Sequence, residues 1–268
     1  MIRLVLALLL FTSALPSQAA NSPWFETEGA RLRLISQPSA DGKTIEAGLE
    51  VRLEKGWKTY WRSPGASGLP PQLDFGASQN VAKTHIHYPV PVTFGEGDNL
   101  TVGYNESVTF PIQIEPLFGN RPVRLALDGL IGICAVVCIP VKFDLVLNED
   151  GKGISTREVA SSLNYARSKL AKEPSEEFRI DTMLYRRKNL EIVATVPKGS
   201  VSSTVLVEGP VSWYLTPAIA KDINGTTARF QIGLPDLPSD ANPLKTELKL
   251  TLISDGNAVE TDMIPTRQ

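Results

Sequence analysis

Alternation of apolar and polar residues is the main pattern in the first half of the chain. In the segment 44–53 every second residue from Ile45 onward is apolar, which is typical of a half-buried β-strand. The same period recurs at 108–114, 123–127 and 141–147. Pro111 interrupts the first of these and favours an edge strand or a bulge, because proline cannot donate a backbone hydrogen bond. Turn-rich stretches separate the strands, so the pattern predicts an antiparallel sandwich.

The period becomes helical between residues 154 and 173. Apolar residues recur there at intervals of three or four, at Val159, Leu163, Ala166 and Leu170. Ser155 and Glu158 have the spacing of a capping box, and Pro174 stops the helix. Alternation then returns at 190–196, 228–232 and 244–252. The sequence therefore predicts an all-β chain of two tandem β-sandwich domains joined by a short helix.

The N-terminus has the pattern of a secretory signal peptide. Arg3 precedes an apolar run at 4–11, and Ser17 and Ala19 suit a cleavage site. The run is shorter than the roughly 20 apolar residues that a membrane span needs. We therefore expect an exported protein, and the formal net charge of −2 gives no general attraction to nucleic acid. The expected divisions are a signal peptide at 1–19, a first sandwich at 20–150, a helical linker at 151–175 and a second sandwich at 176–268.

The two cysteines of the chain, Cys134 and Cys138, lie in the apolar stretch GLIGICAVVCIPVKF at 129–143. An exported pair usually forms a disulfide, and most disulfides are structural. Closing a five-residue loop, however, contributes only about 2 kcal/mol, against about 4.7 kcal/mol for a 100-residue loop. A straight strand would place the two Cα atoms roughly 13 Å apart, whereas a disulfide requires about 4.4–6.8 Å. The chain must therefore turn within 135–137, and a strained or exposed bridge there would be easy to reduce.

A metal site is the alternative use of two thiolates. Structural zinc takes four ligands, and His85 and His87 are the histidines of the chain. They lie on one face of a predicted strand, and an exposed polar strand face is the simpler interpretation of them. We find no GxGxxG motif, no phosphate-binding loop and no Ser/His/Asp order in the sequence. We therefore expect no cofactor and no metal, and the chemistry that the chain can support is thiol–disulfide exchange.

Three motifs together resemble a known family. They are GWKTYWRSPGASGLPP at 56–71, TVGYNESVTFPI at 101–112 and the CxxxCIP of 134–140. They resemble the N-terminal periplasmic domain of the thiol:disulfide interchange protein DsbD, in the variant seen in stand-alone and copper-sensitivity-suppressor relatives. The resemblance implies an immunoglobulin-like sandwich, so we expect two tandem immunoglobulin-like domains. It also implies a periplasmic location, a membrane-embedded thiol transporter as electron donor and periplasmic thioredoxin-like proteins as acceptors.

The resemblance also implies roles for individual residues. Cys138, before Ile-Pro, corresponds to the cysteine that attacks partners, and Cys134 would resolve the mixed disulfide. The loop 94–100 falls where the family has a cap over the disulfide. The best-known caps have adjacent aromatics there, whereas this loop has Phe94 only, at its start. Glu96 and Asp98 would lie near the thiols and disfavour the thiolate.

Aromatic residues around this site have two interpretations. Trp57, Tyr60 and Trp61 could line a docking surface or pack in the core, and Tyr104 of the second motif would lie near the cap. Two other functions stay open beside the redox module. One is a non-catalytic binding or chaperone-like protein with a structural disulfide. The other is a copper-binding protein that uses the two cysteines with His85 and His87.

Overall fold

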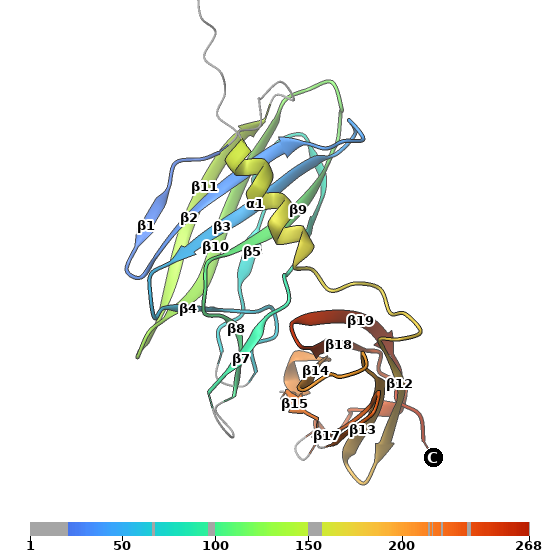
Figure 1. Ribbon diagram of the computed structural model, residues 1–268. Helices are drawn as coiled ribbons and strands as arrows, with labels where there is room; N and C mark the ends of the chain where they lie inside the picture. Colours follow the sequence, from blue (N-terminus) through green and yellow to red (C-terminus); the bar gives the residue numbers. More distant parts are fainter. Residues whose placement is uncertain are drawn as a thin grey trace, which may run out of the picture.

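The computed structural model describes residues 21–65, 68–95, 100–149, 157–213, 215, 217–220, 222–234 and 237–267. Strands dominate these residues, and α1 (Arg157–Ser168) is the one α-helix among them, so the predicted all-β class is confirmed. The strands form two pairs of sheets, one after the other along the chain (Figure 1). No helix of the described ranges is long and apolar enough to cross a membrane. The predicted signal peptide lies outside the described residues.

The first pair of sheets is built from strands that precede residue 150. One sheet has the order β1 (Phe25–Thr27), β2 (Ala30–Pro38), β3 (Ile45–Leu53), β9 (Val108–Pro116) and β6 (Val81–Ile86). The other has the order β11 (Cys138–Glu149), β10 (Val123–Cys134), β4 (Lys58–Tyr60), β8 (Thr101–Tyr104) and β7 (Val92–Phe94), and β5 (Gln72–Asp74) also pairs with β10. Alternate residues of both sheets face a common core, where Leu34, Leu49, Phe110, Leu125 and Ile133 are fully buried.

Pro111 does not lie on an edge strand, so that prediction is wrong. Strand β9 pairs with β3 on one side and with β6 on the other, and the β3–β9 register runs through Pro111 without a bulge. Pairing with β6 ends at Ile86↔Ile112, and Ile112 directly follows the proline in β9. Beyond β6, His87 donates from its backbone N–H to the carbonyl of Pro111 at 2.8 Å, so the position needs the acceptor of proline and tolerates its missing N–H.

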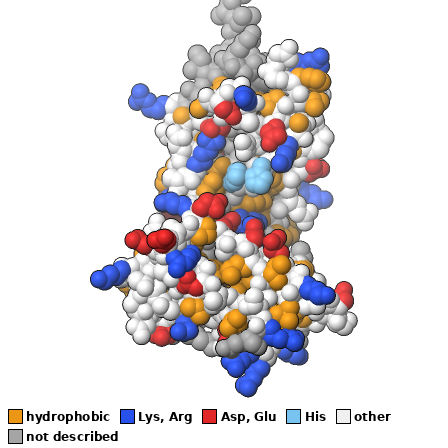
Figure 2. All heavy atoms as spheres, turned by 90° about the vertical axis from the view of Figure 1, so that its right-hand side faces the viewer, with side chains coloured by type: hydrophobic (Ala, Val, Ile, Leu, Met, Phe, Trp, Pro, Cys, Tyr) orange, Lys and Arg blue, Asp and Glu red, His pale blue; other side chains and the backbone are white. Residues whose placement is uncertain are grey.

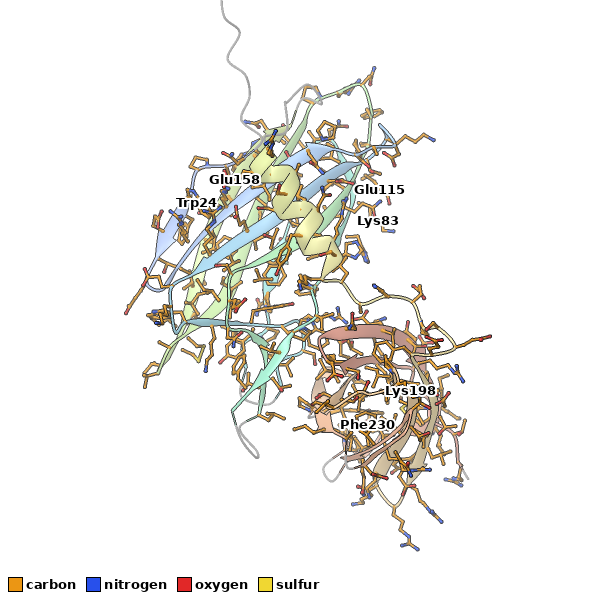
Figure 3. The ribbon with its side chains drawn as sticks, viewed as in Figure 1. Trp24, Lys83, Glu115, Glu158, Lys198 and Phe230 are labelled. Atoms are coloured by element: carbon orange, nitrogen blue, oxygen red, sulfur yellow. A yellow bond between two sulfur atoms is a disulfide. The ribbon has the colours of Figure 1, made fainter. Side chains whose placement is uncertain are left out.

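The second pair of sheets contains four strands in each sheet. One sheet has the order β12 (Arg179–Arg186), β13 (Asn189–Thr195), β17 (Thr227–Gly233) and β16 (Asp222–Asn224). The other has the order β15 (Ala218–Ile219), β14 (Ser203–Glu208), β18 (Leu248–Ser254) and β19 (Asn257–Met263). Ile192, Phe230 and Leu250 lie in the apolar core of this pair, and Figure 3 labels Phe230 within it.

Helix α1 lies across the outer face of the five-stranded sheet. Its buried residues Val159 and Leu163 form a small apolar cluster with Ile35 of β2. Gly48 of β3 leaves room for the helix, because a Cβ there would come within 2.9 Å of Cδ2 of Leu163. The predicted helix is thus confirmed over 157–168, and its apolar face is covered by the first pair of sheets.

Arginines of the first sheet hold the N-terminal turn of α1. Arg33 and Arg52 donate to Oε1 of Glu158 at 2.9 and 2.8 Å, and both guanidinium groups lie over the Trp24 ring. Figure 3 shows Trp24 and Glu158 on the same side of the sheet. These ion pairs lower the pKa of Glu158, through its hydrogen bonds to Arg52 first and to Arg33 second. Glu158 therefore binds two arginines, and Ser155, its predicted capping partner, lies outside the described residues.

Replacing Leu163 with alanine is expected to lower the free energy of unfolding by about 2–5 kcal/mol, because the side chain is fully buried between α1 and the sheet. Urea unfolding followed by circular dichroism measures the change. Tyr165→Ala is the matched control on the same helix, since Tyr165 is 64% exposed. Equal losses in the two variants would mean that α1 is not held by its apolar face.

The two pairs of sheets are in contact. Leu206 of β14 is buried in the first core cluster, and Ile253 of β18 packs against that cluster. Between the two pairs, Lys172 donates from its backbone N–H to the carbonyl of Ala258 at 2.9 Å and accepts from Glu260 at 3.1 Å. The second pair is therefore tied to the first by side chains and by the connecting segment.

Candidate functional site

Cys134 and Cys138 close the end of the hairpin formed by β10 and β11. The register of this hairpin is continuous over twelve residue pairs and ends at Cys134↔Cys138. The chain turns between them through Ala135, Val136 and Val137, as the spacing predicted. The Cα atoms are 4.1 Å apart, and the two sulfurs form a disulfide.

The two cysteine residues differ in their exposure. Cys134 is buried, at 6% exposed, whereas Cys138 is exposed. The turn beside Cys138 is apolar and open, since Val136 is 100% exposed and Val137 is 71% exposed. A partner that approaches this end of the hairpin therefore meets Cys138 and two valines before it meets Cys134.

The Tyr60 side chain contacts both sulfurs. Its hydroxyl oxygen lies 2.9 Å from Sγ of Cys138 and 3.2 Å from Sγ of Cys134. A disulfide sulfur carries no hydrogen, so the hydroxyl is the donor in both contacts. Burial raises the pKa of Tyr60 above its usual value of 10.0. The hydroxyl therefore keeps its proton at neutral pH and can donate it to a sulfur.

Two glycines make room for the Tyr60 ring. A Cβ on Gly132 would lie 2.7 Å from two of the ring carbons, and a Cβ on Gly68 would lie 3.1 Å from Cδ1 of the ring. The neighbouring residue Thr59 donates from Oγ1 to the carbonyl of Gly132 at 2.9 Å. Strand β4 is thereby fixed against β10, and the hydroxyl of the tyrosine lies beside the disulfide.

Lys58 and Phe94 extend the site along the same sheet. Lys58 is the Cα partner of Cys134 on the side away from Cys138, and directly paired residues share a face. Its Nζ lies 4.8 Å from the centroid of the Phe94 ring. Phe94, at the end of β7, is thus linked to the strand that contacts the disulfide. Glu96 and Asp98 of the predicted cap lie outside the described residues.

Tyr104 and Trp61 face the core of the first pair of sheets. Tyr104 is 7% exposed and donates to the carbonyl of Pro89 at 2.8 Å, and burial raises its pKa well above 10.0. Trp61 is 1% exposed. The structure places neither residue in contact with the disulfide, whereas Tyr60, the residue before Trp61 in the first motif, does contact it. For Trp61, packing in the core is the interpretation that holds.

The histidines lie on a different sheet from the cysteines. His85 and His87 are side by side on the surface of the first pair of sheets, with ring centroids 4.5 Å apart (Figure 2). Burial lowers the pKa of His87, and His85 and Arg167 lower it further. Within the described ranges, no three residues among His, Cys, Asp and Glu are grouped so that they could hold a metal ion. The described residues do not bring the four side chains of the Cys2His2 alternative together.

A comparison with protein families shows which family the first pair of sheets resembles. Residues 32–150 match the family described as thiol:disulfide interchange protein DsbD, N-terminal. This segment is therefore similar to the DsbD N-terminal family. The resemblance seen in its motifs is thereby confirmed, and the segment contains both cysteines and Tyr60.

Comparison with solved structures extends the likeness in fold to most of the chain. The N-terminal periplasmic domain of ScsB from Proteus mirabilis has a TM-score of 0.76 and 22% sequence identity, with 93% of this chain and 100% of that chain covered. At this identity the match shows a shared fold. A biofilm-associated protein BSP domain and the YadV chaperone have TM-scores of 0.24 and 0.21, each at 10% identity, and cover 95% and 86% of this chain and 53% and 98% of their own. Those two carry no argument, and no curated protein matches the chain.

Sequence reasoning missed Lys58 and Gly132 as parts of the site. Each owes its place to the pairing of β4 with β10, which joins residues more than 70 positions apart. The one available signal was the position of Gly132 two residues before Cys134 in a run of large apolar residues. A glycine within a strand often marks a close approach by another group, and here that group is the Tyr60 ring.

Proposed function

We propose that this protein is a periplasmic thiol–disulfide exchange protein, a protein-disulfide reductase module that relays electrons through Cys134 and Cys138. Its donor is a membrane-embedded thiol transporter, and its acceptors are thioredoxin-like proteins of the periplasm. Two immunoglobulin-like domains, at 20–150 and 176–268, carry this function, with the segment 151–175 between them. Support comes from the match of residues 32–150 to the DsbD N-terminal family.

The chemistry requires both cysteines in turn. In the reduced protein the Cys138 thiolate attacks a sulfur of the acceptor disulfide, which forms a mixed disulfide and releases the other acceptor sulfur as a thiolate. The Cys134 thiolate then attacks Sγ of Cys138. This step forms the intramolecular disulfide and frees the acceptor as a dithiol. Two electrons pass to the acceptor, and the dithiol of the donor returns two electrons to this protein by the same steps in reverse.

The observation that carries the proposal is the difference in exposure between the two cysteine residues. An attacking thiolate must be accessible to its partner, and Cys138 is exposed beside an open apolar turn. The resolving thiolate needs access only to Cys138, and Cys134 is buried directly opposite it. The arrangement thus suits one cysteine for attack on a partner and the other for release.

A purely structural role explains the disulfide less well. It joins two residues that the hairpin already holds opposite each other, at the end of a continuous register. Closing so short a loop contributes only about 2 kcal/mol in the chain-entropy account. The apolar cores of this chain are large enough that its folding does not depend on so small a contribution to stability.

Redox titration is expected to give a reduction potential between about −270 and −120 mV, the range of thioredoxin-like and other exchange proteins. The full chain after signal removal would be equilibrated with glutathione buffers, and the fraction of free thiol would be measured by alkylation and mass spectrometry. Cys134→Ala provides the baseline, since it cannot form the intramolecular bridge. A potential below about −300 mV would identify a structural disulfide and contradict the proposal.

A further inference from the structure

Arg62 connects the strand that carries Tyr60 to the second pair of sheets. It lies two residues beyond Tyr60, and its Nε and Nη2 donate to the Glu208 carboxylate at 2.8 and 2.7 Å. Nη2 also donates to Oε1 of Glu260 at 2.5 Å. Glu208 is the last residue of β14 and Glu260 belongs to β19, so both acceptors come from the other pair of sheets.

The ion pairs of Arg62 are shielded from water. The Arg62 and Glu208 side chains are only 22% and 17% exposed, and the guanidinium lies 4.3 Å from the centroid of the Trp61 ring. Burial alone would lower the pKa of Arg62, but the two carboxylates outweigh it and raise the pKa. Glu260 is held in turn by Thr251, whose hydroxyl donates to the same Oε1. A bidentate arginine in such a setting fixes orientation, which a lysine could not do.

The segment between Arg62 and the disulfide has little freedom to move independently. Trp61 donates from its backbone N–H to the carbonyl of Val102 at 3.1 Å, and Val102 donates to the carbonyl of Pro64 at 3.1 Å. Gly68, later in the same loop, lies against the Tyr60 ring. Arg62 and the ring whose hydroxyl contacts both sulfurs therefore lie on one hydrogen-bonded segment. In Figure 1 the tip of the β10–β11 hairpin and the second pair of sheets both lie at the lower end of the first pair, the tip on the left and the second pair on the right.

We propose that the second pair of sheets, through Glu208 and Glu260, holds Arg62 so that the Tyr60 hydroxyl stays on the sulfurs of Cys134 and Cys138. Arg62 is then a positioning residue, and the second domain tunes the reactivity of a disulfide that it does not touch. This inference rests on the proposed function, because tuning the disulfide is useful only if the disulfide takes part in exchange. Its test does not, because it measures the thiols themselves and needs no partner.

The test is the pH profile of alkylation of the reduced full-length mature protein by iodoacetamide. Arg62→Gln and Glu260→Gln are expected to slow alkylation at pH 7 by about threefold, since a displaced Tyr60 hydroxyl no longer stabilises the thiolate. The pH of half-maximal rate should rise, and the rate at high pH should be unchanged. Tyr60→Phe removes the hydroxyl itself, so it should slow alkylation more than either of these variants. The double variant Tyr60→Phe/Arg62→Gln should be no slower than Tyr60→Phe, because both changes act through one hydroxyl.

Arg52→Gln is the matched control. Arg52 also donates to two glutamates, Glu50 and Glu158, and its guanidinium also lies over a tryptophan ring, but it holds helix α1. Its profile should equal that of the unmodified protein. An unchanged profile in both Arg62→Gln and Glu260→Gln, additive effects in the double variant, or an equal shift in Arg52→Gln would each overturn the proposal. Glu260→Gln keeps the size of the side chain, so it tests the contact even where Arg62→Gln fails to fold. Failure of the wild-type protein to exchange with any partner would instead overturn the proposed function.

Discussion

Replacing Cys134 with alanine is expected to trap the protein in a covalent complex with a thioredoxin-like acceptor, whereas replacing Cys138 is expected to give no complex. In the first variant the exposed Cys138 can still attack, but no thiolate is left to resolve the mixed disulfide. In the second variant the remaining sulfur belongs to Cys134, which is only 6% exposed. The reduced variants would be mixed with periplasmic extract and separated on a non-reducing gel.

The double variant Cys134→Ala/Cys138→Ala supplies the blank for this experiment, and any complex must disappear on addition of dithiothreitol. The acceptor in the gel band is identified by mass spectrometry. Trapping by the Cys138→Ala protein alone would reverse the two roles. Trapping by neither variant across the extract would favour a structural disulfide over exchange.

The fold was predictable from the sequence wherever the pattern is local. Alternation at 44–53 predicted β3, and the helical period between 154 and 173 predicted α1. The neighbours of each strand were not predictable, because pairing is decided by segments far apart in the chain. Pro111 shows the difference. Its lack of a backbone N–H predicted a position without a hydrogen-bond acceptor beside it. Only the strand pairing shows that this is because β6 ends there, and that β9 is not an edge strand.

The same division holds at the site. The spacing of Cys134 and Cys138 required a turn between them, and the structure has that turn. The role of Tyr60 depends on the pairing of β4 with β10, and the hydroxyl contacts cysteines 74 and 78 positions later in the chain. The partners of Arg62 are still further away, at separations of 146 and 198 residues. No periodicity or motif within YWR indicates two carboxylates at such distances.

Replacing Tyr60 with phenylalanine is expected to slow alkylation of the reduced protein at pH 7 by about tenfold. A hydrogen bond to a charged group is worth about 1.5 kcal/mol or more, and about 1.4 kcal/mol corresponds to a factor of ten in the population of the thiolate. Because burial raises the pKa of Tyr60, the hydroxyl remains a donor from acid to mildly alkaline pH. The loss should therefore persist across the neutral range and vanish only where the thiols of the variant are themselves fully ionised.

Tyr104→Phe is the matched control for this substitution. It removes the same hydroxyl from an equally buried tyrosine on the neighbouring strand, but that hydroxyl donates to the carbonyl of Pro89 and not to sulfur. Tyr104→Phe should therefore lower the melting temperature without moving the alkylation profile, whereas Tyr60→Phe should move the profile. If both variants alkylate like the unmodified protein, the Tyr60 hydroxyl contacts the disulfide without stabilising the thiolate. The reactivity of Cys138 would then depend on its exposure and on the positive charge of Lys58, which pairs with Cys134 on the same sheet.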